Sequence, residues 1–401
     1  MYETWRWFGP KDQVDLQDIV QSGASGIVTA LHHIPPGEVW TADEIGHRKS
    51  LIRTSGMALH SPLNWSVVES LPVSENIKRQ SEDWRSHVEN YKTSLVNLSE
   101  AGIDIVCYNF MPILDWTRTD LAYQLPNQAT CMRFDLVDFI MFDVFLLKRP
   151  GAQEDFDEPL VEKARARFSA CDGAYKKRLT NNVISGLPGG ADTMTMDQIS
   201  DHLNLYADID EDQLVRNQTD FLEIIAPHAE KLGLRLCCHP DDPPIRLLGL
   251  PRIMSTEADY QRLISTVDIP ANGITFCTGS LGTRADNDLP TMMRRLGDRV
   301  HFIHLRNVVR EHKQTFGSFH ESEHLSGDVD MAAVVSAIVD EETRRKSLGR
   351  SDHSIPFRPD HGQDILDDLN RKSQPGYPAI GRLKGLAELR GLIAGLEYKA
   401  A

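Results

Sequence analysis

The sequence is poor in cysteine and has no long apolar run. Its 401 residues include six cysteines, which have neither the density nor the spacing of a disulfide framework. No apolar run reaches the roughly 18 residues that a membrane span needs, and the first ten residues contain no apolar signal segment. We therefore expect a chain of the reducing cytoplasm that has no membrane partner.

Positive charge is also scarce. Lysine and arginine total 43 against 58 acidic residues, which gives a formal net charge of -15 at pH 7. No run of Lys and Arg is interleaved with aromatic residues, so the usual electrostatic footprint of a nucleic-acid partner is missing. A small acidic substrate stays compatible with this composition where arginines gather locally.

Several familiar motifs are missing as well. No Gly-x-Gly-x-x-Gly follows the first predicted strand, and the chain has no phosphate-binding P-loop, no Gly-x-Ser-x-Gly elbow and no Cys-x-x-Cys pair. A dinucleotide-binding fold, a serine hydrolase of the α/β type and a tight cysteine zinc site are therefore disfavoured.

What the sequence does contain is a regular alternation of strands and helices. Short apolar runs predict eight strands, at 26–31, 57–61, 103–110, 130–134, 234–238, 274–276, 301–303 and 354–359, of which 130–134 is the weakest. Helical patterns occupy 15–22, 77–101, 135–147, 211–232, 259–265, 289–296 and 331–345. This alternation predicts an α/β fold, and eight strands favour a (β/α)8 TIM barrel over an open doubly wound sheet.

The length of the chain leaves room for insertions. A barrel of this type needs roughly 250 residues. No low-complexity linker or internal repeat divides the sequence, so we expect a single domain over 1–401 with insertions at about 148–196 and 307–330. An insertion over the mouth of the barrel can act as a lid that excludes water.

Metal-competent side chains end the last four predicted strands. His239, Cys277, His304 and Asp360 each follow one of these runs. The carboxyl ends of parallel strands meet at one face of a barrel, so residues far apart in sequence can converge there on one ion. Two imidazoles, a thiolate and a carboxylate suit Mn, Fe, Co or Zn better than Mg or Ca.

Each of these residues alone is weak evidence, because a cysteine at a strand end commonly packs in the core and a lone histidine commonly has a structural role. Other signals are weaker still. The segment His320–His324 resembles a metal-binding helix face but lacks the His-Glu-x-x-His order. His32 and His33 are typical of a structured loop. The Gly-rich turn at 279–282 could bind an anion through its backbone N–H groups, but such turns are a low-specificity signal.

Five longer motifs resemble those of a known family. They are TWRWFG at 4–9, VVESLPV at 67–73, YNFMP at 108–112, DWTRTD at 115–120 and RPDHG at 358–362. With them the chain resembles the mannonate dehydratase family of the UxuA type. The resemblance implies a xylose-isomerase-like barrel, Mn(II) or Fe(II) as cofactor, and dehydration of D-mannonate to 2-keto-3-deoxy-D-gluconate in hexuronate catabolism. It also implies metal ligands at His239, Cys277, His304 and Asp360.

Dehydration of a sugar acid needs a base for the C2 proton and an acid for the leaving hydroxyl group. His361 follows Asp360 directly, and an imidazole changes protonation near neutral pH. Tyr377 lies on a loop after the last strand, and the resemblance points to the same pair. Which of the two is the base stays open at this stage. The alternatives are a His361 that only orients Asp360 and a Tyr377 that only packs.

An anionic substrate needs cations in an acidic protein, and polar or aromatic groups must position its hydroxyls. The candidates are Arg306, Arg358, Arg6, Arg118, Asn109 and Trp5.

Two other function classes remain at this stage: a metal-dependent sugar isomerase or epimerase on the same barrel, and a non-catalytic binding protein. We also expect a homo-oligomer, a dimer or larger, because barrels with insertions commonly associate through them.

Overall fold

Eight parallel strands close into a barrel in the computed structural model, which describes residues 1–185, 194–311 and 314–400. The order around the barrel is β1-β12-β9-β8-β7-β4-β3-β2. The strands are β1 (Tyr2–Arg6), β2 (Gly26–Thr29), β3 (Asn64–Glu69), β4 (Ile105–Tyr108), β7 (Arg235–Cys238), β8 (Asn272–Cys277), β9 (Val300–Leu305) and β12 (Pro356–Pro359). The predicted (β/α)8 barrel is confirmed.

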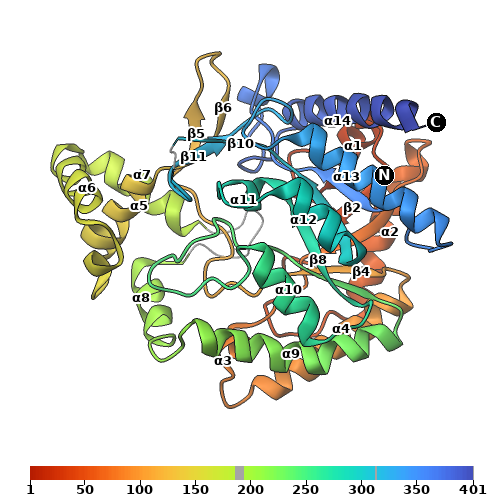
Figure 1. The fold of residues 1–401 in the computed structure, drawn as a ribbon, viewed down its shortest axis with the longest axis horizontal. Helices are drawn as coiled ribbons and strands as arrows, with labels where there is room; N and C mark the ends of the chain where they lie inside the picture. The colour runs from red at the N-terminus through yellow and green to blue at the C-terminus, as the bar shows by residue number, and fades with distance from the viewer. Residues whose placement is uncertain (186–193, 312–313, 401) are drawn as a thin grey trace.

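Helices surround this barrel on its outer side (Figure 1). They are α1 (Leu16–Ser22), α2 (Ala42–Ala58), α3 (Glu75–Arg79), α4 (Trp84–Glu100), α9 (Glu211–Lys231), α10 (Glu257–Thr266), α11 (Thr278–Gly282), α12 (Leu289–Leu296), α13 (Met331–Ser347) and α14 (Ala379–Ala400), with short turns η3 (Gly297–Arg299) and η4 (Leu366–Leu369). Across the described part of the chain, every helix is too short or too polar to cross a membrane.

A second sheet of antiparallel strands lies beside the barrel. Its order is β10-β11-β6-β5, and its strands are β5 (Asp120–Gln124), β6 (Thr130–Phe134), β10 (Val308–Arg310) and β11 (Phe319–Glu321). A group of helices extends from this region, at the left of Figure 1: α5 (Leu136–Ile140), the π-helix η1 (Met141–Leu147), η2 (Ala152–Asp155), α6 (Glu158–Ala170), α7 (Gly173–Ile184) and α8 (Met196–Asn204). These helices share their own apolar cluster, built around Phe139, Phe142 and Val183.

Two strand predictions were wrong in their placement. Residues 57–61 are the end of α2 and the turn after it, whereas the neighbouring strand is β3. Helix α2 buries only Ile45, Arg48, Ile52 and Gly56, so its apolar periodicity is weak and its last apolar residues imitate a strand. Residues 130–134 do form a strand, but β6 belongs to the antiparallel sheet.

The eighth barrel strand is β1, which the apolar pattern missed because Glu3, Thr4 and Arg6 interrupt it. Two helix predictions also differ: 77–101 is two helices, α3 and α4, and 135–147 lies outside the barrel as α5 and η1. Residues 186–190, a turn-rich part of the predicted 148–196 insertion, lie outside the described residues, as does His312 of the 307–330 insertion.

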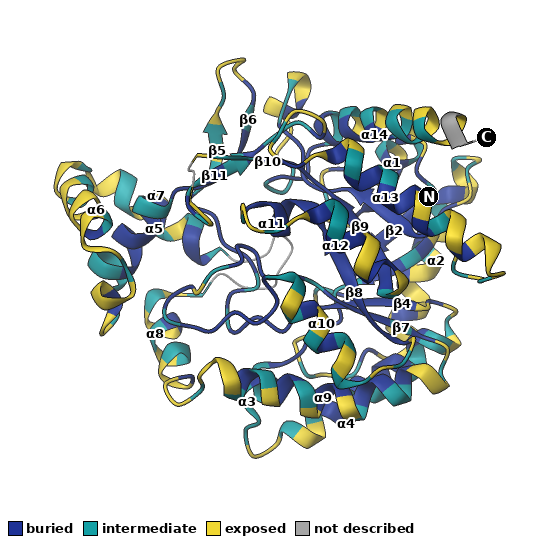
Figure 2. Ribbon diagram, in the orientation of Figure 1, coloured by how far each residue is buried: buried dark blue, intermediate teal, exposed yellow. Residues whose placement is uncertain are grey.

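Apolar side chains fill the interior of the barrel. Val28, Val67, Ile105, Cys107 and Phe302 form one buried cluster with Cys237, contributed by five different strands. A larger cluster joins the barrel to the helices around it, and Figure 2 shows both as dark ribbon beneath helices whose outer faces are exposed. The filled interior fixes the strand ends on which the site is built.

Replacing Phe302 tests this interior. Phe302 is fully buried, so Phe302→Ala removes an aromatic side chain that the closed barrel cannot refill, and we expect a loss of about 3–5 kcal/mol in the free energy of unfolding. The measurement is urea or thermal unfolding followed by circular dichroism. Tyr398, 86% exposed, provides the control, because Tyr398→Ala should change stability by less than about 0.5 kcal/mol. Equal effects of the two substitutions would contradict this packing.

Candidate active site

Three of the predicted metal ligands converge at the carboxyl ends of neighbouring barrel strands. His239 follows β7, Cys277 ends β8 and His304 lies near the end of β9. One donor atom from each of the three residues lies within 4.8 Å of the other two. His239 Nε2 is 3.2 Å from His304 Nδ1. The strands β7, β8 and β9 are adjacent in the barrel, so closure of the sheet produces this convergence.

Asp360, the fourth predicted ligand, follows β12 and lies against the same cluster. Its Oδ2 atom is 3.8 Å from Cys277 Sγ and 3.9 Å from His304 Nδ1. Its other oxygen accepts a hydrogen bond from Arg358. The structure therefore brings all four predicted ligands to one place on the catalytic face of the barrel.

The protonation of these side chains follows from burial. Burial, reinforced by nearby His304, lowers the pKa of His239 to about 4, and burial with Arg358 lowers the pKa of His304. His239 Nδ1 lies 2.7 Å from the Pro240 carbonyl oxygen and donates to it, which leaves the Nε2 lone pair free. Burial and then Asp360 raise the pKa of the Cys277 thiol, to which the Ser280 amide points.

The donor set fits a divalent transition metal. Neutral imidazoles offer lone pairs, the hydrogen bond to Pro240 orients one of the rings, and a thiol gives up its proton when a cation binds. An N, S, N set with an adjacent carboxylate suits Mn, Fe, Co or Zn.

His361 and Tyr377 face each other beside this cluster. The imidazole and phenol rings have centroids 5.0 Å apart and are nearly perpendicular. His361 has a left-handed backbone conformation with φ of 54°, which is uncommon for a residue with a Cβ and frequent at functional sites. Its Nδ1 lies 3.2 Å from Glu321 Oε1. Burial raises the pKa of Tyr377, although Arg358 acts in the opposite direction.

A small cavity of about 40 Å³ lies among these groups. The predicted substrate residues Arg6, Arg358 and Asn109 line it, together with Trp116 and Phe8. This volume is small beside the roughly 300–1,000 Å³ of typical ligand pockets.

Three predicted substrate contacts, Trp5, Arg306 and Arg118, are not brought into the cavity, and Arg118 is fully buried against Asp242 and Glu321. Trp5 is 1% exposed and packs beneath Arg382, whose guanidinium carbon lies 4.2 Å from the ring centroid. Arg306 is 1% exposed and donates to Asp242 and Glu321 instead. Its stem also fills the space above Gly279, where a Cβ atom would lie 2.2 Å from Arg306 Cδ. The turn at 279–282 therefore packs against Arg306.

Carboxylates that the sequence did not single out balance the arginines of the site. Glu321 accepts hydrogen bonds from Arg306 at 2.7 and 2.8 Å, and Arg118 lies 3.2 Å away from it. Asp242 forms ion pairs with Arg118 at 2.8 Å and with Arg306 at 2.7 Å. Glu69 pairs with Arg358 at 2.8 Å. Burial opposes ionisation of Glu321, yet Arg306, His361 and Arg118 lower its pKa to about 2.

Local signals for these carboxylates existed in the sequence. Glu69 lies in the motif at 67–73, Asp242 lies in the turn after His239, and Glu321 lies between His320 and His324. His32, also noted in the sequence, lies 3.1 Å from Arg6 through its Nε2 atom.

The fold and the site together define a class: a barrel enzyme whose cluster of metal-competent and acid-base groups lies at the carboxyl ends of the strands. The family model described as D-mannonate dehydratase (UxuA) matches residues 1–401. The chain belongs to the D-mannonate dehydratase (UxuA) family. It is therefore a carbon-oxygen hydro-lyase that acts on D-mannonate.

Named relatives agree with this membership. The chain is 54% identical over 398 residues to mannonate dehydratase of Rhizobium meliloti (strain 1021), an alignment that covers 99% of this chain and 98% of the relative. It is 55% identical over 392 residues to mannonate dehydratase 1 of Agrobacterium fabrum, covering 98% and 96% of the two chains. The crystal structure of mannonate dehydratase from Streptococcus suis serotype 2 superposes with a TM-score of 0.76 at 32% identity, covering 100% and 94%.

The alternative of a sugar isomerase or epimerase is not favoured, because the family and these relatives are dehydratases.

Two glutamates of the second sheet region allow a test of the buried charge network. Glu321 is 1% exposed, whereas the Glu311 side chain, paired with Arg133 at 2.6 Å, is 25% exposed. Glu321→Gln leaves buried arginines short of a charge, so we expect a loss of about 3–5 kcal/mol in unfolding free energy. Glu311→Gln should cost less than about 1 kcal/mol. Denaturant unfolding measures both.

The pH dependence of the unfolding free energy of Glu321→Gln gives a second test of this ion pair. The pKa of Glu321 lies near 2 in the folded protein against an ordinary 4.5, so its contribution is present above pH 4.5 and is lost as pH falls towards 2. The stability gap between the natural protein and Glu321→Gln should narrow over that interval. A gap that stays constant would contradict an ionised, arginine-bound Glu321.

Proposed function

We propose that this chain converts D-mannonate to 2-keto-3-deoxy-D-gluconate and water, using Mn(II) or Fe(II) held by His239, Cys277, His304 and Asp360. The observation that carries the proposal is the convergence of His239, Cys277 and His304 donor atoms within 4.8 Å, in a chain of the mannonate dehydratase family. A divalent cation bound there would stabilise the negative charge that builds on the substrate carboxylate and C2 oxygen as the C2 proton leaves.

In this proposal His361 is the base. The carboxylate of Glu321 lies 3.2 Å from Nδ1, and its negative charge favours the proton on that atom, so that Nε2 keeps the lone pair and accepts the C2 proton. Glu321 is itself fixed by Arg306 and Arg118, which limits rotation of the imidazole indirectly. His361 lines the cavity in which the substrate carbon must lie.

Tyr377 is the acid in the same scheme. Burial raises the pKa of this phenol, so it is protonated at neutral pH and suits donation rather than acceptance of a proton. Tyr377 lines the cavity, and its hydroxyl has no hydrogen-bond partner among the described residues. Donation from Tyr377 Oη to the C3 oxygen lets that group leave as water, and the resulting enol becomes the 2-keto product.

Arg358, Arg6 and Asn109 are the groups proposed to position the substrate. Arg358 forms ion pairs with both Glu69 and Asp360 in this structure. A substrate carboxylate that binds Arg358 therefore replaces one of these two carboxylates on its guanidinium group. Asn109 donates to Asp115 at 3.2 Å and offers its carbonyl oxygen to a sugar hydroxyl.

The wider setting is also part of the proposal. We place the reaction in hexuronate catabolism in the cytoplasm, with a single-domain chain that associates into a homo-oligomer. All of the cysteines are free, which suits a reducing compartment.

The metal site is tested by Cys277→Ala. Loss of the thiolate should weaken Mn(II) binding by at least about a hundredfold, since loss of even an outer partner of a ligand costs about 10–100-fold. Metal content after gel filtration, measured by mass spectrometry, gives the readout independently of turnover. Cys171, half-buried and away from the site, provides the control variant Cys171→Ala. Retention of metal by Cys277→Ala at the natural affinity would remove Cys277 from the ligand set.

The acid is tested by Tyr377→Phe. We expect turnover of D-mannonate to fall about 10²–10⁴-fold while the metal content stays unchanged, because only the proton donor is lost. The conservative change Tyr398→Phe on the exposed end of α14 should leave turnover as it is. Normal turnover in Tyr377→Phe would exclude the phenol as the acid.

Product analysis tests the overall reaction. Mn(II)-loaded protein incubated with D-mannonate should give a 2-keto-3-deoxy acid lighter by one water, seen by mass spectrometry and NMR. A product that keeps all of its oxygen atoms would contradict the dehydration and favour an isomerase.

A further inference from the structure

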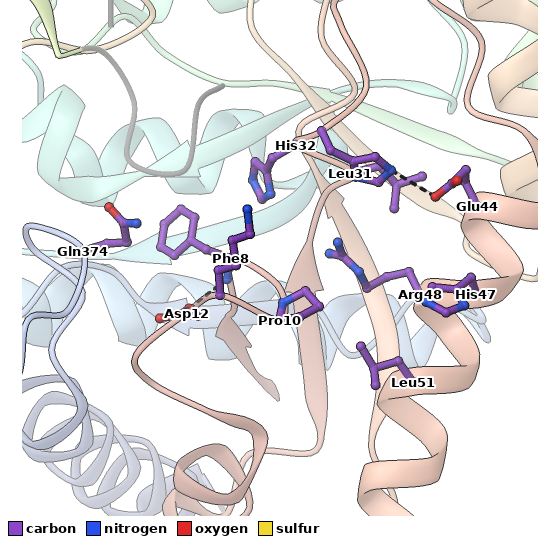
Figure 3. A pocket seen from close by; sticks show the side chains of 12 residues that line it. Phe8, Pro10, Asp12, Leu31, His32, Glu44, His47, Arg48, Leu51 and Gln374 are labelled. Atoms are coloured by element: carbon purple, nitrogen blue, oxygen red, sulfur yellow. Dashed lines mark hydrogen bonds and ion pairs between the residues drawn. The ribbon is translucent and has the colours of Figure 1, made fainter. Parts of the chain in front are cut away.

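A second cavity adjoins the catalytic one on the same face of the barrel. It has a volume of about 820 Å³ and is lined by the loops that follow β1 and β2, by the first turns of α2 and by Gln374. Figure 3 shows Phe8, His32 and Arg48 around this space. Its volume lies within the roughly 300–1,000 Å³ of typical ligand pockets.

Phe8 forms a shared wall between the two cavities, because its side chain lines both. The Phe8 ring meets Tyr377 edge-on with centroids 4.8 Å apart, and it lies 5.8 Å from the His32 ring. The catalytic cavity holds only about 40 Å³, so the larger cavity is the neighbouring space in which a six-carbon acid has room. Movement of one phenyl ring would connect the two.

Arg48 gives the second cavity a buried positive charge that Glu44 balances only from a distance. It is 7% exposed, and its Nη1 donates to neutral acceptors, Thr29 Oγ1 at 3.0 Å and the Ala30 carbonyl at 2.9 Å. Among the described residues it has no ion pair, whereas Arg118, Arg306 and Arg358 are each paired with carboxylates. In Figure 3 its side chain extends from α2 into the space bounded by Phe8, Pro10 and His32.

The acidic residues of this cavity are already engaged. Glu44 lies 3.0 Å from His33, although it still acts on Arg48 through space. Asp12 accepts hydrogen bonds from the backbone amides of Phe8 at 2.8 Å and Val14 at 3.0 Å. Exposed Lys11 at the rim adds a second cation. A buried guanidinium without a carboxylate is costly unless an anion joins it.

We propose that this cavity is a second binding site for a small polyhydroxy carboxylate, from which the sugar acid passes Phe8 to reach the catalytic groups. Arg48 binds the carboxylate through its unoccupied N–H groups, Lys11 attracts it at the rim, and Phe8, Leu31 and Leu51 contact the carbon chain. This second binding site rests on the proposed function only in that the function identifies the sugar acid that binds there.

Binding stoichiometry is the direct test. The probe is D-mannonate, added in equilibrium dialysis to full-length Mn(II)-loaded Tyr377→Phe protein, in which turnover is about 10²–10⁴-fold slower. We expect two molecules per chain, and one after the further change Arg48→Gln. A single molecule in both proteins, or two in both, would overturn the proposal. Inorganic phosphate that fills the second site as tightly as D-mannonate would overturn its assignment to a sugar acid.

Lys11→Glu keeps the proposal testable where Arg48→Gln fails to fold, because Lys11 is exposed. In the otherwise natural enzyme it should lower kcat/KM about tenfold at low salt with kcat unchanged, and added salt should reduce the difference. Lys163→Glu on α6, with the same change of charge on an exposed helix, should leave both constants unchanged. Equal effects of these two charge changes would overturn the approach site.

The two proposals fail separately. A chain that binds a second D-mannonate but releases no 2-keto-3-deoxy acid retains the cavity assignment and loses the dehydratase assignment. A chain that dehydrates D-mannonate but has one binding site per chain retains the dehydratase assignment and loses the cavity assignment.

Discussion

Parallel closure of eight strands is the constraint on which the chemistry of this chain depends. Adjacent parallel strands end at the same face, so β7, β8 and β9 deliver an imidazole, a thiol and an imidazole to one point although 65 residues separate His239 from His304. The packed interior of Val67, Phe302 and their neighbours holds the strands in register. Donor atoms at the ends of packed strands are held more precisely than donor atoms on loops.

The charged layer above the strands solves a second problem, which is how an acidic protein accepts an anion. Four arginines of this face are held by Glu69, Asp242, Glu321 and Asp360, so the site is close to neutral and its guanidinium groups are pre-oriented. They are Arg6, Arg118, Arg306 and Arg358. Buried ion pairs of this kind contribute little net stability but leave a large penalty when one partner is lost. Their role in the proposed mechanism is orientation, most directly of His361 by Glu321.

The sequence predicted the barrel and the four strand-end donors because both depend on local pattern. An apolar run followed by a turn is visible in the chain, and His239, Cys277, His304 and Asp360 each sit at that position. Glu69 was not identified as a site residue because its strand was placed at 57–61, where the end of α2 imitates an apolar strand. Trp5 belongs to a long motif, yet strand alternation directs its side chain into the core and places Arg6 at the cavity.

The only local signal for Glu321, its place between His320 and His324, did not predict its contact with His361. Glu321 lies in the three-residue strand β11, which pairs with β10, close to it in the sequence, and with β6, far from it in the sequence. Its position beside His361 follows only from that pairing. The large cavity beside Phe8 likewise depends on how two barrel loops and α2 pack together. Such features arise from long-range packing, which a single sequence does not display.

Cobalt(II) substitution tests the central claim most directly, because a thiolate bound to cobalt gives a ligand-to-metal charge-transfer band in the near ultraviolet. Titration of metal-free protein with Co(II) should produce this band and saturate at one ion per chain, as expected for a single centre that contains Cys277. Co(II) binding without the band, or saturation at more than one ion, would contradict a site built from His239, Cys277, His304 and Asp360.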